Sequence, residues 1–259
     1  MRIWYQSYSA IGFDPRWAYY EEHLARYVRE VARPTTEVSV HGVPLMVDRM
    51  VNSRYLQYLH ARQVHDNALE AERQGYDAFL LGGMLDLAYH ELHELLTIPV
   101  LFIAETSFHV ACLLSPNFSV IAPNAAVLAG IEGRVEDYGL GRRYVPGVHL
   151  GGMPLEEMVA SFAEPGPVLE RIAAAAREAI GRGARLLVPG FGALNVFLVA
   201  QGVRACDGIP VLDNTAVLIK MAEARVDLCR LGARGGRRGP GAPPSREDVQ
   251  AARRLYGLD

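Results

Sequence analysis

The chain has 259 residues, of which 50% are hydrophobic and 21% are charged, so it is long enough to bury a sizeable core in one large or two small domains. Its net charge of −3 gives no reason to expect nucleic acid or a membrane as a partner, since both call for a basic face. Without a signal-peptide pattern or an apolar run long enough to span a bilayer, we expect a cytoplasmic protein.

Strand-like and helix-like segments alternate along the first half of the chain. An aspartate cap and a proline open the first helix, β-branched residues alternate in the second strand, and the third strand is a continuous apolar run, as in a covered parallel sheet. The predicted strands cover residues 1–7, 36–44, 77–83 and 98–105, and the predicted helices cover 14–32, 55–76 and 87–96.

The second half repeats this plan, with predicted strands over 118–124, 184–190 and 209–213 and helices over 167–183, 193–204 and 214–232. We therefore predict an α/β fold of two pseudo-symmetric Rossmann-like halves with parallel sheets and an interdomain cleft. The first half should comprise residues 1–115 together with 210–232, and the second should comprise 116–209. Residues 233–259 should form a flexible Gly/Pro/Arg-rich tail and a C-terminal helix.

Two blocks of sequence carry a family resemblance. "YDAFLLGGMLDLAYHELHELLTIPVLFIAETSFHVA" (76–111) and "GARLLVPGFGALNVFLVAQGVRACDGIPVLDNTAVLIKMAE" (183–223) share a strand, a glycine turn, a helix and an "IPV" strand. Both resemble blocks of the aspartate/glutamate/hydantoin racemase superfamily, and the hydantoin racemase branch is the more similar. The resemblance implies a cleft that holds a small carboxylate or cyclic amide, and it implies an oligomer.

The resemblance also implies two catalytic cysteines, one at the end of the strand in each block, which transfer protons on opposite faces of the substrate. At these positions this chain has Gly83 and either Phe191 or Gly190, whose side chains cannot transfer a proton. Cys112, Cys206 and Cys229 fall elsewhere and form no CxxC pair, so we interpret them as apolar packing residues. Another group must therefore do the acid/base work.

Asp86 and His90 follow the first glycine turn and are candidates for that work. Asp86 could equally cap the helix that begins near Leu87, because a short carboxylate accepts the free N–H groups there. The "HELHE" cluster that starts at His90 differs from the HExxH arrangement of zinc peptidases. We therefore predict no metal, and we keep a zinc hydrolase only as a third alternative.

Glu105 stands at the predicted end of the following strand, with Thr106 and Ser107 behind it. A carboxylate shielded in a cleft can act as a general base, and the hydantoin racemase branch has an acidic residue after the corresponding strand. A capping box would also explain this composition. We predict catalysis by Glu105 and substrate binding by Thr106 and Ser107.

Further candidates lie in other turns that should border the cleft. Tyr5 is a candidate proton donor in the first turn. The candidate substrate-binding residues are the hydroxyls of Ser7 and Ser9, the glycine-turn residues Gly82, Gly83, Gly190, Phe191 and Gly192, and the helix-opening residues Asp213, Asn214 and Thr215. Glycines let a backbone N–H approach an oxyanion, and a helix N-terminus stabilises an anion, although capping alone could explain the last three.

These observations predict a cofactor-independent enzyme of the isomerase or racemase type with non-cysteine acid/base chemistry. Lyase, decarboxylase or ring-opening hydrolase chemistry on the same fold is the alternative, as is a non-catalytic ligand binder. No GxGxxG motif follows the first strand and no Walker loop is present, so no cofactor is expected. The expected partners are a small-molecule substrate and further copies of the chain.

Overall fold

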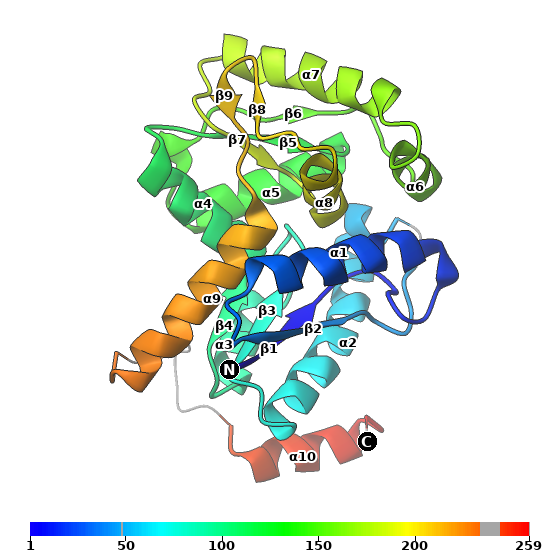
Figure 1. Ribbon diagram of the computed structural model, residues 1–259. Coiled ribbons are helices and arrows are strands. Elements are labelled where there is room, and N and C mark those ends of the chain that lie inside the picture. The colour runs from blue at the N-terminus through cyan, green and yellow to red at the C-terminus, as the bar shows by residue number, and fades with distance from the viewer. Residues whose placement is uncertain (48, 234–243, 259) are drawn as a thin grey trace.

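The computed structural model describes residues 1–47, 49–233 and 244–258, which form two lobes, each built on a parallel sheet (Figure 1). The first sheet has the order β2-β1-β3-β4, with β1 (Arg2–Gln6), β2 (Glu37–His41), β3 (Ala78–Leu81) and β4 (Val100–Phe102). The second has the order β6-β5-β7, with β5 (Ser119–Ala122), β6 (Val148–His149) and β7 (Leu187–Pro189). The predicted α/β class with two parallel sheets is confirmed, while the predicted domain boundaries stay a prediction.

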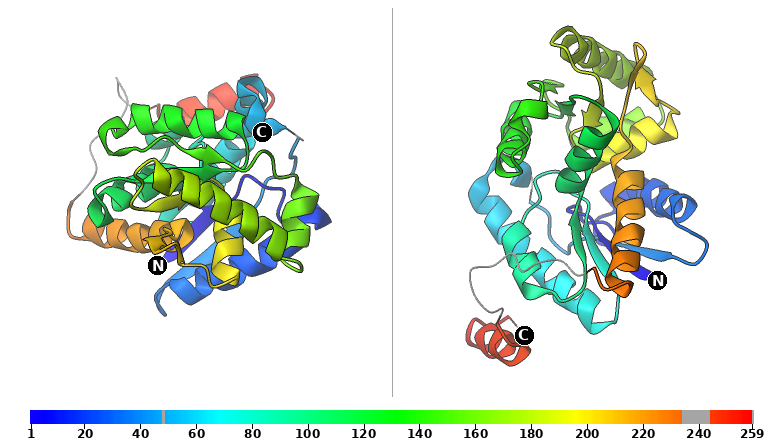
Figure 2. Two further views of the ribbon diagram at one scale, coloured as in Figure 1. Left: turned by 90° about the horizontal axis from the view of Figure 1, so that it is seen from above. Right: turned by 90° about the vertical axis from the view of Figure 1, so that its left-hand side faces the viewer.

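Helices cover both faces of each sheet. They are α1 (Ala18–Val31), α2 (Arg54–Arg73), α3 (Tyr89–Leu95), α4 (Ile103–Leu114), α5 (Ala125–Asp137), α6 (Leu155–Ser161), α7 (Gly166–Gly181), α8 (Gly192–Ala200), α9 (Asn214–Arg230) and α10 (Arg246–Leu255), with short 3-10 turns η1 (Pro15–Trp17), η2 (Met50–Asn52) and η3 (Gly141–Arg143). In the first lobe α1 and α9 pack on one side of the sheet, and α2 and α3 pack on the other (Figure 2).

The two lobes are joined by helices rather than by a shared sheet. α1 packs on α8, α4 packs on α9, and η2 packs on α5. α9 starts beside the second lobe and runs down along the first sheet, while α10 lies at the far end of the first lobe (Figures 1 and 2). α10 contacts α2 through ion pairs of Arg253 with Asp66 at 2.6 Å and of Arg246 with Glu72 at 3.3 Å. The predicted tail falls partly on residues 234–243 and 259, which lie outside the described residues.

Two predicted boundaries are wrong. The strand predicted over 98–105 ends at Phe102, and α4 begins at Ile103, because the apolar run continues across the boundary and hides it. The strand predicted over 209–213 is a two-residue strand, β9 (Ile209–Pro210), paired in a hairpin with β8 (Ala205–Cys206). Asp207 and Gly208 both have positive φ, the conformation that an Asp-Gly hairpin turn requires. No predicted element corresponds to α5, β6, α6 or β8.

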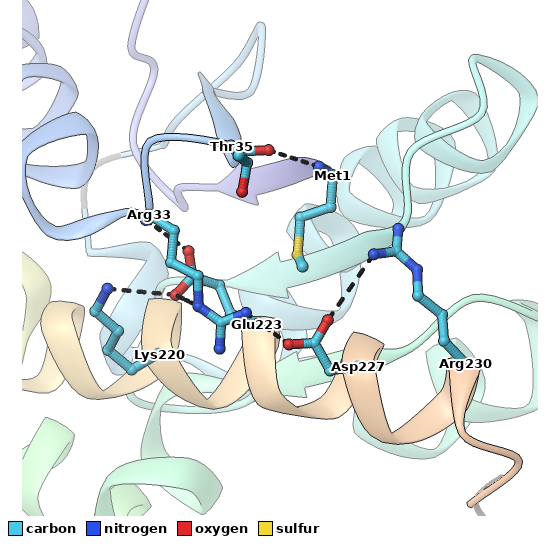
Figure 3. A network of polar contacts seen from close by, with 7 residues as sticks. All are labelled: Met1, Arg33, Thr35, Lys220, Glu223, Asp227 and Arg230. Carbon is cyan, nitrogen blue, oxygen red and sulfur yellow. Dashed lines mark hydrogen bonds and ion pairs between the residues drawn. The ribbon is translucent and has the colours of Figure 1, made fainter.

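A buried carboxylate on α9 anchors the turn between α1 and β2 (Figure 3). Glu223 is fully buried and accepts a hydrogen bond from the backbone N–H of Arg33 at 2.7 Å, and Lys220 Nζ lies 3.3 Å from its other oxygen. Burial alone would raise the pKa of Glu223, but these donors outweigh it and hold the pKa below its usual range. The lowered pKa means that the ionised form stabilises the fold.

We therefore expect Glu223→Gln to lower the free energy of unfolding by about 1–3 kcal/mol at pH 7, because donors to a buried charge lose their partner. A carboxylate with a lowered pKa stabilises the fold above its unfolded pKa, and this contribution is lost as the pH falls through the folded value. The difference between the two proteins should therefore shrink below about pH 4. Urea denaturation followed by circular dichroism at pH 7 and pH 3 measures it.

The control is Glu30→Gln, which removes an exposed partner of Arg26 on α1 at 3.8 Å. It should change the stability by less than about 0.5 kcal/mol. Equal losses in the two variants would contradict the role assigned to Glu223.

Candidate functional site

The turns after β3 and β7 meet the start of α9 where the two lobes face each other. A Cβ added to Gly192 would lie 3.2 Å from the carbonyl oxygen of Gly82. Asn214 donates from Nδ2 to the carbonyl of Pro189 at 2.7 Å and lies 3.5 Å from the Sδ of Met84. The carboxyl ends of both sheets therefore converge, as expected of a binding site in this fold class. We call the region formed by Tyr5, Tyr8, Gly82, Gly83, Gly192, Asn214 and Thr215 the central site.

Two tyrosines cover the glycine pair at the end of β3. A Cβ on Gly82 would lie 2.3 Å from the hydroxyl of Tyr5, and a Cβ on Gly83 would lie 2.0 Å from Cε2 of Tyr8. Real Cβ atoms essentially never lie so close to another atom, so the tyrosine rings would have to shift to admit a side chain. Neither glycine has a positive φ, so the rings, rather than the backbone conformation, exclude a side chain here. The space next to Gly82 and Gly83, where the sequence predicts substrate binding, is thus occupied by the rings of Tyr5 and Tyr8 from the first lobe.

The phenols of the central site are neutral at physiological pH. Burial raises the pKa of both Tyr5 and Tyr8 well above the ordinary value of 10. For Tyr5, burial outweighs Thr215, which lowers the pKa, and the charge of Asp213 raises the pKa by a smaller amount. Tyr20, from α1, is also buried, and a Cβ on Gly192 would lie 2.9 Å from its hydroxyl. Neutral phenols can donate hydrogen bonds or protons, but they do not act as anionic bases.

Asp86 caps α4, not the nearby α3 that the sequence suggested. Its fully buried carboxylate accepts hydrogen bonds from the backbone N–H groups of Ala104 at 3.1 Å and Glu105 at 2.9 Å. The hydroxyl of Tyr138, at the end of α5 in the second lobe, donates to the same carboxylate at 2.6 Å. Desolvation raises the pKa of Asp86 to about 7, because burial outweighs these three donors. Through its hydrogen bond with Tyr138, Asp86 therefore links the first lobe to α5 of the second lobe.

Glu105 lies in the first turn of α4 rather than at a strand end. Its carboxylate accepts a hydrogen bond from the hydroxyl of Tyr89 at 2.5 Å, and it is close enough to Asp86 for their charges to repel. Its side chain is half-buried, whereas Asp86 is enclosed. Of the two carboxylates, Glu105 is therefore the more accessible to solvent.

The start of α9 is held by side chains that sequence reasoning did not single out. Asn195, on α8, accepts from the backbone N–H of Asn214 at 2.9 Å and donates to Asp213 at 3.2 Å and to the hydroxyl of Thr215 at 3.1 Å. Asp213 itself caps α9 by accepting from the N–H of Ala216 at 3.1 Å, and it also accepts from the hydroxyl of Tyr27. Asp213 therefore caps α9, which is the alternative to substrate binding that the sequence left open.

The backbone N–H groups of Gly82 and Gly190 are engaged in hydrogen bonds within the protein. The N–H of Gly82 donates to the carbonyl of Gln6 at 2.8 Å, and the N–H of Gly190 donates to the carbonyl of Ile121 at 2.7 Å. Both bonds continue the sheets. A Cβ on Gly190 would lie 2.7 Å from the same Ile121 oxygen, so glycine is required there by the neighbouring strand.

The other predicted residues are spread over the interface. Ser7 and Ser9 are buried, and their hydroxyls lie 2.9 Å apart. Thr106 and Ser107 are buried in α4, and the half-buried Phe191 precedes α8. Among the described residues, three buried polar atoms of these candidates accept or donate no hydrogen bond within distance and angle limits: Ser107 Oγ, Asn214 Oδ1 and the Tyr5 hydroxyl. The structure does not bring His90 into the site, because its side chain is exposed on α3.

The three cysteines lie outside the central site. Cys112 is near the end of α4, Cys206 is in β8, and Cys229 is near the end of α9. Burial raises the pKa of Cys112 and Cys206, which disfavours the reactive thiolate. Within the described ranges, no three His, Cys, Asp or Glu side chains are grouped so that they could hold a metal ion, and no helix is long and apolar enough to cross a membrane.

Comparisons with known proteins agree on one family. Residues 18–222 match the profile of the family described as Asp/Glu/Hydantoin racemase. A hydantoin racemase from Pseudomonas sp. (strain NS671) is 27% identical over 210 residues, which cover 80% of this chain and 80% of that protein.

Solved structures extend the likeness to the whole fold. An allantoin racemase from Pseudomonas fluorescens is 25% identical with a TM-score of 0.78, covering 94% of this chain and 97% of the other. An allantoin racemase from Klebsiella pneumoniae is 22% identical with a TM-score of 0.75, covering 95% of this chain and 94% of the other.

The raised pKa of Asp86 gives a testable pH dependence. A carboxyl group whose folded pKa is raised stabilises the protein fully below its unfolded pKa, and this contribution is lost as the pH rises through the folded value. The stability of the wild type minus that of Asp86→Asn should therefore fall by up to about 4 kcal/mol between about pH 4 and about pH 7, since the pKa rises from 3.8 to about 7. Chemical denaturation across this range measures the difference.

Tyr138→Phe is the matched variant, because the hydrogen bond from Tyr138 lowers the pKa of Asp86. Its removal should move the pH window upward while leaving the carboxyl group in place. If the free energy of unfolding of the wild type minus that of Asp86→Asn stays constant or rises with pH, the pKa of Asp86 is not raised.

Proposed function

The chain belongs to the Asp/Glu/hydantoin racemase family, and on that premise we propose that it is an isomerase that moves a proton on a small cyclic amide, with oxygen-bearing groups in place of thiols. The observation that carries this proposal is the packing of Tyr5 and Tyr8 over Gly82 and Gly83. The sequence resemblance assigns the first catalytic thiol of the family to position 83. In this chain a phenol ring fills that space.

We assign the proton carriers from their exposure and charge. Removing a proton next to a carbonyl requires a base and a donor that stabilises or quenches the resulting enolate. Glu105 is the base, because its carboxylate is half-buried and is oriented by Tyr89. Tyr5 is the donor, because its buried phenol keeps its proton at neutral pH. Asp86, enclosed by three donors, is a positioning residue that fixes the start of α4 and hence Glu105.

The charge of the central site favours a neutral substrate over an amino acid. None of the residues that define the central site is a lysine or an arginine. Arg134 lies near enough to lower the pKa of Tyr8, but it already bonds the carbonyl of Leu85 at 2.9 Å and Asp137 at 3.0 Å. A substrate carboxylate buried there would have to compete with these partners, and a buried charge without a partner is costly. A cyclic amide instead presents N–H and C=O groups that Asn214, Thr215 and the phenols can satisfy. The names of the relatives, hydantoin and allantoin racemase, support the same substrate class.

Proton exchange in deuterated water tests the proposal. The purified protein should catalyse deuterium incorporation at C5 of 5-methylhydantoin or allantoin at pH 7, faster than a buffer blank, with loss of optical rotation. Glu105→Gln and Tyr5→Phe should each slow the exchange by about 100-fold or more, because each removes a positioned proton carrier. NMR spectroscopy and polarimetry provide the two measurements.

Glu94→Gln is the control, since Glu94 is an exposed glutamate on α3. It should exchange at the wild-type rate. Thermal stabilisation by these compounds without any exchange would show a non-catalytic binder. A product of changed mass would show lyase or ring-opening chemistry instead.

A further inference from the structure

The ring of Tyr8 is held firmly although its backbone lies in a loop after β1. Its hydroxyl accepts a hydrogen bond from the backbone N–H of Leu87 at 2.5 Å, across the glycine turn. The edge of the ring meets His60 of α2, with 5.9 Å between the ring centroids. Only 8% of the Tyr8 residue is exposed. The ring is thus fixed from both ends by contacts that do not depend on a ligand.

The position of the Tyr8 ring also limits the space for a side chain or a ligand next to Gly83, at the end of β3. A Cβ on Gly83 would meet three atoms of the Tyr8 ring within 2.5 Å, and all three belong to the side chain. Gly83 has no left-handed backbone conformation that would otherwise require glycine. Tyr8 and Gly83 therefore form a matched pair, in which the aromatic ring takes the place of a side chain at position 83.

We infer that Tyr8 is the specificity-determining residue of the central site, which restricts the site to compact cyclic amides without a bulky substituent on the Gly83 side. This inference rests on the proposed function. The Tyr8 ring fills the space against the β3 end, so a ligand that carries a ring of its own there would collide with it. Tyr5 plays a different part, because it covers the neighbouring Gly82 with its hydroxyl and the adjoining ring carbons, whereas the three atoms nearest to a Cβ on Gly83 all belong to Tyr8.

Removing the ring should open a space that fits an aromatic group. Side-chain truncation in a packed interior leaves a void, and apolar voids of this size accept aromatic ligands. In Tyr8→Ala we therefore expect 5-benzylhydantoin to bind at least 10-fold more tightly than in the wild type, while unsubstituted hydantoin changes less. Tyr8→Phe keeps the ring and loses only the hydroxyl, so it should keep the selectivity of the wild type.

A stability measurement tests the matched pair independently of any ligand. Gly83→Ala in the wild-type background should lower Tm by about 4 °C or more, because the added methyl group overlaps the ring. The same substitution in the Tyr8→Ala background should lower Tm by less than about 2 °C. Equal losses in both backgrounds would overturn the steric coupling.

Isothermal titration of the three proteins with both hydantoins separates the remaining outcomes. If unsubstituted hydantoin binds all three proteins but 5-benzylhydantoin gains nothing in Tyr8→Ala, the assignment of specificity to Tyr8 is wrong and the proposed function stands. If neither compound binds any protein and no proton exchange occurs, the proposed function fails, and the specificity role fails with it.

Discussion

The close approach of two tyrosine rings to the Gly82–Gly83 backbone is the constraint on which the rest of the central site depends. Cβ atoms at these glycines would lie 2.3 Å and 2.0 Å from the side chains of Tyr5 and Tyr8. The glycines are therefore fixed by packing, not by turn conformation or by an oxyanion. This arrangement places neutral phenols at the end of β3, with the carboxylates of Asp86, in the turn between β3 and α3, and Glu105, on α4, near that turn.

The carboxylates of Asp86 and Glu105 differ in burial and in hydrogen-bond partners. Asp86 accepts three hydrogen bonds and is fully buried, so it fixes the first turn of α4 and holds α5 of the second lobe through Tyr138. Glu105 receives its backbone position from Asp86 and its side-chain orientation from Tyr89. The surroundings of the two groups thus leave one carboxylate enclosed and the other more accessible.

Much of the fold could be predicted from local pattern, but much of the site could not. The apolar run at Ala78–Leu81 and the glycine turn after it are local features, and both are where the sequence put them. The capping of α4 by Asp86 joins residues 18 and 19 positions apart, so no local pattern shows it. The roles of Asn195 and Tyr138 depend on contacts between lobes and leave no sequence signal. The Asp207–Gly208 turn is different, because that dipeptide is a recognised hairpin signal.

The repeat in the sequence predicts two equivalent turns, one after β3 and one after β7. In the structure, tyrosine side chains from the first lobe cover both turns. Tyr5 and Tyr8 cover the turn after β3, and Tyr20 of α1 reaches the turn after β7 at Gly192. All three belong to the first 20 residues. A two-sided proton transfer with one group from each repeat would need a donor from the second lobe, and Phe191 cannot supply one. The packing therefore breaks the symmetry of the repeat at these two turns, because the phenols that cover both of them come from the first lobe.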